Sequence, residues 1–132
     1  MNPEKCLIDT TIWVLYFKGK RELKDKIKSL ILEERAATCE IVTLEVLRGA
    51  KAQKEYNQLQ ADFVALPILK LTNIIWEKSY KVGFKLRERK IDVPLANILI
   101  ATVASHYHCL LLHRDKHFPL MKRVMDLSLI HI

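Results

Sequence analysis

The sequence predicts a single α/β domain in which a largely parallel sheet carries helices on both faces. The chain has 132 residues, which is enough for one compact domain and too few for two of ordinary size. Half of the residues are apolar, and three glycines and four prolines are the only strong helix breakers, so helices should dominate. Short apolar runs alternate with long helical segments, and strands separated by whole helices pair in parallel rather than as hairpins.

The amino-terminal third of the chain predicts a strand followed by two helices. Residues 6–8 are an uninterrupted apolar run, which is typical of a strand buried on both faces. Thr10 and Thr11 are suited to cap the next helix, whose apolar side chains recur at helical spacing. Gly19, between two lysines, ends that helix, and residues 22–34 form a second, amphipathic one.

The rest of the chain continues the alternation of strands and helices. The expected ranges are residues 37–42 (strand), 43–60 (helix), 63–66 (strand, stopped by Pro67), 72–89 (helix), 94–105 (helix, opened by Pro94) and 109–112 (strand). Proline suits the first turn of a helix, where its missing N–H would have no partner in any case. Together with residues 6–8 these ranges make four strands.

Four polar side chains stand where the carboxyl ends of the strands should meet. Asp9 follows the first strand, Asp115 follows the last, and Glu45 lies in the first turn of the helix after the second strand. Asn97 lies in the first turn of the apolar helix over residues 94–105. Because ligands of parallel α/β sheets bind beyond the carboxyl ends of the strands, we expect these side-chain oxygens to converge in one pocket.

Such a cluster of carboxylates predicts a divalent cation. Buried carboxylates are costly unless they are paired or bound to a metal, and without one their pKa values should rise. Hard oxygen ligands favour Mg²⁺ or Mn²⁺ over zinc, and such an ion can activate water and neutralise charge on a phosphodiester. Each acid taken alone could equally complement a helix dipole. With 22 Lys and Arg against 15 Asp and Glu, a net charge of +7 favours a polyanionic partner, so the combination suggests a metal-dependent nuclease.

The cysteines and the hydropathy pattern favour a cytosolic protein. Cys6, Cys39 and Cys109 are an odd number without a CxxC pair, and each lies among apolar neighbours, as a reduced buried thiol would. No apolar run approaches the roughly 20 residues needed to span a bilayer, and the amino terminus lacks the pattern of a signal peptide. We therefore expect no membrane association.

Four ordered sequence blocks resemble the signature blocks of PIN-domain ribonucleases. They are residues 7–13 (LIDTTIW), 43–50 (TLEVLRGA), 93–101 (VPLANILIA) and 112–118 (LHRDKHF). The nearest resemblance is to the VapC-type toxins of type II toxin–antitoxin systems. It implies a three-layer α/β/α fold with a central, mostly parallel sheet of four to five strands. It also implies Mg²⁺ or Mn²⁺ as cofactor, RNA as substrate, a VapB-type antitoxin and a homodimer.

The resemblance also implies roles for individual residues. Asp9, Glu45 and Asp115 match three members of the family's quartet of catalytic, metal-binding acids, and Thr10 or Thr11 matches the hydroxyl that supports the site. Asn97 stands where the family normally has Asp, so we expect it to be a neutral fourth ligand or to hold a metal-bound water. Three carboxylates should bind a divalent ion more weakly than four.

Two hypotheses follow. The first is an Mg²⁺-dependent endoribonuclease toxin in which metal-activated water attacks the RNA phosphodiester in line. The second is a catalytically impaired PIN-fold module that binds RNA or an antitoxin, because Asn97 replaces the usual acid.

Several further residues are candidates for contact with RNA or a partner. Arg48 lies one turn after Glu45, and three basic residues flank Asp115, so phosphate contact is expected for Arg48, His113, Arg114 and His117. Basic residues also cluster within residues 18–28 and 78–90, as an RNA-approach surface or as ordinary solvated helix faces. The aromatic side chains of Trp13, Tyr16 and Phe17 fit either the core or an antitoxin surface.

We expect the last six residues to differ in origin from the rest. Residues 127–132 (LSLIHI) match one reading frame of a common sequencing-library transposon adaptor. We therefore divide the chain into a PIN domain over residues 1–126 and a non-native tail over residues 127–132, which we exclude from functional reasoning. A short apolar strand is what the family would normally have at this point.

Overall fold

The computed structural model describes residues 4–132, in which four strands form one fully parallel sheet. The strands are β1 (Cys6–Ile8), β2 (Ala36–Ala37), β3 (Leu110–His113) and β4 (Ser128–His131), in the spatial order β2-β1-β3-β4. Leu7 of β1 lies opposite Ala37 on one side and Leu111 on the other. The predicted parallel α/β sheet is confirmed, and β1 and β3 are its two central strands.

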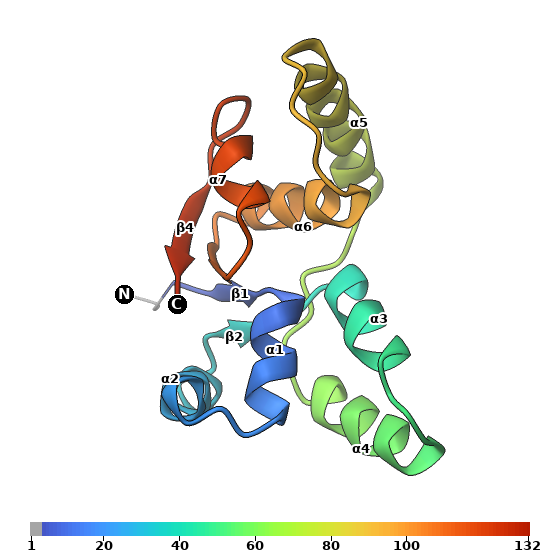
Figure 1. Cartoon of the computed structure of the whole chain (residues 1–132), viewed down its shortest axis with the longest axis vertical. Helices are drawn as coiled ribbons and strands as arrows, with labels where there is room; N and C mark the ends of the chain where they lie inside the picture. Colours follow the sequence, from blue (N-terminus) through green and yellow to red (C-terminus); the bar gives the residue numbers. More distant parts are fainter. Residues whose placement is uncertain (1–3) are drawn as a thin grey trace.

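Seven helices connect and cover the strands. They are α1 (Thr10–Phe17), α2 (Arg21–Leu32), α3 (Glu40–Arg48), α4 (Gln53–Val64), α5 (Asn73–Glu88), α6 (Leu95–His106) and α7 (His117–Met121). In Figure 1, α5, α6 and α7 occupy the upper half of the molecule and α2 and α4 the lower half, with β1 and β2 between them. None of the helices within residues 4–132 combines the length and the apolar character needed to cross a lipid bilayer.

The core forms around the two central strands. Leu7, Ile8, Leu111 and Leu112 are almost completely buried, as expected for apolar strands that helices cover on both faces. Helix α1 contributes the buried Trp13, whose indole ring lies 5.2 Å from the ring of Phe63 on α4. This contact anchors α4 to the rest of the domain.

The segment between the first two strands and α5 departs from the prediction. The expected strand over residues 37–42 shrinks to the two residues of β2, because α3 already begins at Glu40 and buries Val42 and Val46 at helical spacing. The expected single helix over residues 43–60 is two helices, α3 and α4, separated by residues 49–52. The break turns the chain so that α4 packs back on α3 and on Trp13.

The strand predicted over residues 63–66 is wrong. Phe63 belongs to α4, where Leu59 and Phe63 are buried four residues apart, on one face of the helix. Extended pairing occurs slightly later in the chain, where Ile68 forms an isolated parallel bridge with Thr38. Burial of Phe63 against Trp13 outweighs the β propensity of this short run.

Smaller differences concern element ends. Asp9, rather than Thr10 or Thr11, is the N-cap of α1, and Pro94 is the N-cap of α6 rather than its first residue. Strand β3 covers residues 110–113 instead of 109–112. Residues 128–131, which we regard as part of a non-native tail, form the edge strand β4 beside β3.

Three helices end on a residue other than glycine in the left-handed region. Glu34, Lys90 and His108 follow α2, α5 and α6 with φ values of 58°, 57° and 55°. Each is followed by an N–H that bonds back to a carbonyl in the last helical turn, as Arg35 does to Leu30 at 2.9 Å. These turns direct the chain from helix α2 into β2 and from α6 into β3.

Candidate active site

Asp9 lies at the carboxyl edge of the sheet, directly after β1. Its backbone N–H donates to the carbonyl of Leu112 at 2.9 Å, so the last residues of β1 and β3 are held side by side. Asp115 follows β3 by two residues and therefore emerges at the same edge. The carboxyl group of Asp9 is buried, with 5% of the residue exposed.

Burial and neighbouring charges raise the pKa of Asp9 to about 6 from its ordinary value of 3.8. Burial contributes most, and the negative charges of Asp115 and Glu45 add to the rise. The N–H groups of Thr10 and Thr11 lower it, although neither makes a capping hydrogen bond with the side chain. The raised pKa expected for a crowded carboxylate is thus confirmed at Asp9.

Glu45 is positioned by a hydroxyl from α1. Thr10 donates a hydrogen bond from Oγ1 to Glu45 Oε1 at 2.6 Å, although 35 residues separate the two in sequence. Thr11 instead exposes its side chain to solvent. Of the two threonines predicted to support the site, the structure therefore places Thr10 on an acid.

Asp115 is held by donors of the chain itself. Asn97 donates from Nδ2 to Asp115 Oδ2 at 3.0 Å. The backbone N–H of His117 donates to Oδ1 at 2.8 Å, and the His117 ring places Nδ1 2.7 Å from the same oxygen. Burial alone would raise the pKa of Asp115, but the hydrogen bonds from Asn97 and His117 outweigh it and lower the pKa. The raised pKa expected for every crowded carboxylate is therefore wrong at Asp115.

His113 has a structural role that differs from the predicted contact with RNA. The residue is 1% exposed, and its Nδ1 accepts a hydrogen bond from the backbone N–H of Asp115 at 3.0 Å. Burial and the neighbouring His131 lower its pKa, and its ring packs edge-on against Phe118 of α7. The predicted phosphate contact of His113 is wrong because the packing of α7 removes this ring from the surface.

The other three residues predicted to contact RNA differ in their surroundings. Arg48 is exposed at the last position of α3. Arg114 donates to the carbonyl of Ile132 and lies 3.6 Å from a carboxylate oxygen of Glu22. His117 contacts Asp115 directly, a role that sequence reasoning missed. The spacing of two residues, typical of a turn in which an Asp side chain accepts a backbone N–H, was the available signal.

Of the four predicted site residues, Asn97 and Asp115 form one hydrogen-bonded pair and Glu45 pairs with Thr10. Glu45 and Asp115 both lie close enough to Asp9 to affect its pKa. Within residues 4–132, no three His, Cys, Asp or Glu side chains are grouped tightly enough to form a ready-made metal cage.

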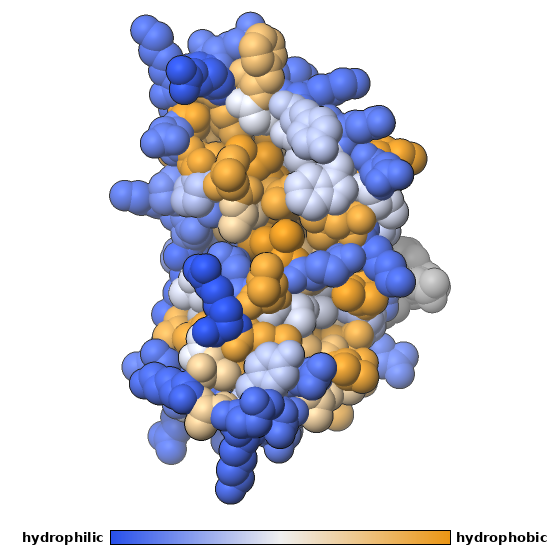
Figure 2. Space-filling model, turned by 90° about the vertical axis from the view of Figure 1, so that its right-hand side faces the viewer, coloured by the Kyte–Doolittle hydropathy of each residue, from blue (hydrophilic) through white to orange (hydrophobic). Residues whose placement is uncertain are grey.

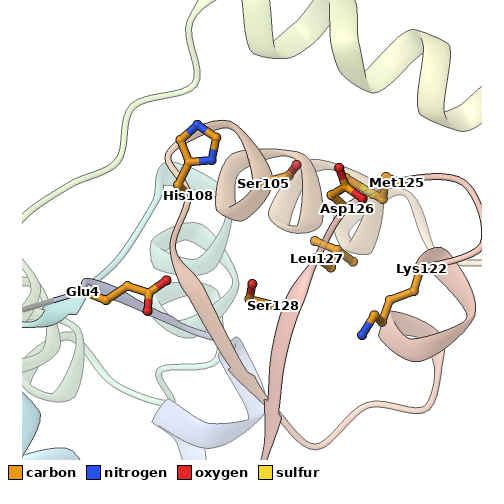
Figure 3. Close-up of a pocket in the computed structure, with 8 residues that line it drawn as sticks. All are labelled: Glu4, Ser105, His108, Lys122, Met125, Asp126, Leu127 and Ser128. Carbon is orange, nitrogen blue, oxygen red and sulfur yellow. The ribbon is translucent and has the colours of Figure 1, made fainter.

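One cavity lies next to Glu45, and another lies at the opposite edge of the sheet. One, of about 410 Å³, extends from Glu45 between α1, α3 and α4 and is lined by Phe17, Val46 and Leu59 among others. Another, of about 540 Å³, lies at the opposite edge of the sheet, next to the residues that precede β1, β3 and β4 (Figure 3). Of the candidate site residues, Glu45 lines the first cavity, and none of them lines the second.

Comparison with known proteins adds three findings. The family model described as "PIN domain" matches residues 6–124. Ribonuclease VapC11 of Mycobacterium tuberculosis is 28% identical over 127 residues, which are 92% of this chain and 95% of the relative. The fold matches that of VapBC2 from Rickettsia felis bound to a promoter DNA fragment, with a TM-score of 0.80, 19% identity and coverage of 96% and 98%. It also matches DNA-bound VapBC from Salmonella typhimurium, with a TM-score of 0.83, 15% identity and coverage of 98% of both chains.

Proposed function

This chain belongs to the PIN domain family, and on that premise we propose that it is an endoribonuclease toxin of the VapC type that requires Mg²⁺ or Mn²⁺. The observation that carries the proposal is Asp9, a buried carboxylate at the sheet edge whose pKa is raised to about 6 by burial and by two neighbouring acids. A buried carboxylate whose pKa is shifted by burial and by specific neighbouring charges is a candidate functional group. The 28% identity to a ribonuclease over nearly the whole chain supports the same activity.

The donor set fits a hard divalent cation. Asp9, Glu45 and Asp115 offer only carboxylate oxygens. Their mutual repulsion, which adds to the effect of burial on the pKa of Asp9, is what a cation would relieve. Bound there, the ion would activate a water molecule and neutralise charge on the scissile phosphate. Asp9 must be ionised to hold it, Thr10 orients Glu45, and His117 orients Asp115.

The substrate we propose is RNA, approached from the basic surface. Arg48 is exposed one turn beyond Glu45 and can reach a phosphate next to the acids. Further lysines and arginines lie on α2 and α5, at opposite ends of the molecule in Figure 1, and contribute to the net charge of +7. Contacts of this kind bind phosphates without regard to base and weaken as salt rises.

The partner we propose is a VapB-type antitoxin that binds in the cavity between α1, α3 and α4. Its lining is apolar at Val14, Phe17, Val46 and Leu59 and carries two lysines, Lys18 and Lys51, and two glutamates, Glu45 and Glu55. An amphipathic segment with charged residues of both signs beside its apolar face would match this surface. Glu45 also lines the cavity, so an occupant would reach the active site. Solved relatives named VapBC belong to a family of toxin–antitoxin systems, which supports this assignment.

We further propose that two copies of the chain associate through α5 and α6. Tyr80 and Phe84 of α5 and Leu95 of α6 are 67%, 65% and 79% exposed, and a shallow hollow beside them is lined almost entirely by apolar atoms. Figure 2 shows apolar surface extending from the α5 end of this face toward its centre, with hydrophilic side chains around it. Exposed apolar surface of this kind is typical of a protein interface.

Cleavage of RNA by the purified chain, with Mg²⁺ or with excess chelator, tests the nuclease proposal. We expect cleavage that needs Mg²⁺ or Mn²⁺ and is lost in Asp9→Ala, while RNA binding remains. Cleavage that persists in excess chelator would overturn the metal mechanism.

The second candidate is an impaired module that binds RNA or antitoxin without cutting RNA, and the neutral Asn97 favours it. It would be supported if wild type binds RNA without cutting it, with either metal.

A further inference from the structure

We propose that Asn97 is a positioning residue, rather than a metal ligand, and that its amide holds Asp115 in place before any cation binds. In a site with an acid at position 97, a bound metal would have to supply this positive partner for Asp115. This inference rests on the proposed function, because it concerns the ion that Asp9, Glu45 and Asp115 would hold. Its central claim is that this chain assembles the Asp115 side of the site without metal.

The hydrogen-bond pattern at Asp115 carries the inference. Asn97 Nδ2 lies 3.0 Å from Oδ2, and the N–H and ring of His117 engage Oδ1, so both oxygens of Asp115 have donors within the chain. The amide orientation follows from the chemistry, since turning Asn97 around would place its carbonyl oxygen against a carboxylate oxygen, and neither can donate. Asn97 therefore faces Asp115 with its donor.

The hydrogen bond between Asn97 and Asp115 links two rigid parts of the fold. Asn97 is 7% exposed in the first turn of α6, whose following residues Ile100 and Ala101 are buried in the core. Asp115 lies in the turn after β3, which His113 braces from the other side through the Asp115 N–H. The hydrogen bond from Asn97 thus fixes a turn residue to a buried helix.

An aspartate at position 97 would turn the attractive contact with Asp115 into a repulsive one. It would place a second carboxylate where the amide now donates, about 3.0 Å from Asp115 Oδ2. Two such oxygens repel unless a cation or a shared proton lies between them. Metal binding should therefore stabilise the all-acid arrangement far more than the present one. Asn at position 97 thus lowers the dependence of the folded site on metal.

Thermal unfolding with and without Mg²⁺ tests this inference without RNA. We would compare wild type, Asn97→Ala and Asn97→Asp at pH 8 in chelator and in Mg²⁺. Asn73→Asp, an exposed position on α5, is the control for adding one negative charge. We expect Asn97→Asp to melt about 4 °C or more below wild type in chelator, and its gain in Tm on adding Mg²⁺ to exceed that of wild type by a similar amount. Asn97→Ala should gain an intermediate amount, and Asn73→Asp should behave like wild type.

The order of the three increases in Tm on adding Mg²⁺ determines whether the inference holds. Equal gains for wild type, Asn97→Ala and Asn97→Asp would overturn it, because a residue with a merely structural role would change Tm without changing the response to metal. If Asn97→Asp fails to fold, the comparison of Asn97→Ala with wild type decides. If the order holds but wild type cuts no RNA, the inference stands and the nuclease proposal fails. If wild type cuts RNA but the order fails, only the inference is lost.

Discussion

The hydroxyl of Thr10 donates a 2.6 Å hydrogen bond to the carboxylate of Glu45 and thereby joins the first turn of α1 to α3. Replacing Thr10 by Val keeps the shape of the side chain and removes the donor. Because orienting partners of metal-binding carboxylates typically contribute 10–100-fold, we expect RNA cleavage to fall by about that factor. Thr11→Val, at the exposed neighbouring position, should cleave as wild type does. Equal rates for the two variants in a cleavage assay would contradict the orienting role.

Asp9 should destabilise the fold at neutral pH. Its pKa in the folded protein, about 6, lies above its ordinary value of 3.8. Below pH 3.8 the carboxyl group is protonated in both states, and the penalty grows up to pH 6 and is complete above it. Asp9→Asn should therefore raise the free energy of unfolding by up to about 3 kcal/mol at pH 8 and by little at pH 4.

Urea denaturation of Asp9→Asn at pH 4, 6 and 8 checks this prediction. The exposed Asp25→Asn on α2 serves as control and should change stability little at any of these pH values. A loss of stability in Asp9→Asn at pH 8 would mean that the charged form of Asp9 is well accommodated in the fold.

RNA affinity should depend on Arg48 through phosphate contact. In the Asp9→Asn background, which should bind RNA without cutting it, Arg48→Ala should weaken binding and reduce the slope of log affinity against log salt by about 0.7, the value for one contact to a single strand. Filter binding or fluorescence anisotropy across a range of salt concentrations measures both quantities. Lys122→Ala, which removes a positive charge beside the cavity at the opposite edge of the sheet, should leave the slope unchanged.

The apolar face of α5 and α6 should determine the oligomeric state. Tyr80→Lys places a charge at the centre of this face and should convert a dimer into a monomer in sedimentation experiments. Leu32→Lys, at an equally exposed apolar position on α2, is the matched control and should leave the dimer intact. A wild-type monomer at concentrations of tens of micromolar would contradict the proposed interface.

The parts of the fold that could be predicted from sequence are those with strong local patterns. The short apolar runs of β1 and β3 favour buried strands, and Ile75, Val82 and Leu86 mark the buried face of α5. The region from residue 37 to residue 66 was misassigned because β2 has only two residues and the place of Phe63 depends on a ring elsewhere in the chain. No local pattern reports such a contact.

The candidate site was predictable to a similar degree. The rule that strands end at one edge brings Asp9 and Asp115 together, and Asp9 does respond to the charges of Asp115 and Glu45. What could not be predicted is how each side chain is used. The burial of His113 depends on the packing of α7, and the donor role of Asn97 depends on which oxygen of Asp115 faces it.

The three left-handed residues that follow α2, α5 and α6 leave stability that this fold could still gain by mutation. Each of Glu34, Lys90 and His108 adopts a backbone conformation in which a β-carbon is unfavourable by about 1 kcal/mol, and none of them contributes a side chain to the Asp9 site. Glycine at each of these positions should raise stability by about that amount. A lineage that acquired these glycines could tolerate otherwise damaging changes around Asp9, and so could explore new substrates without unfolding.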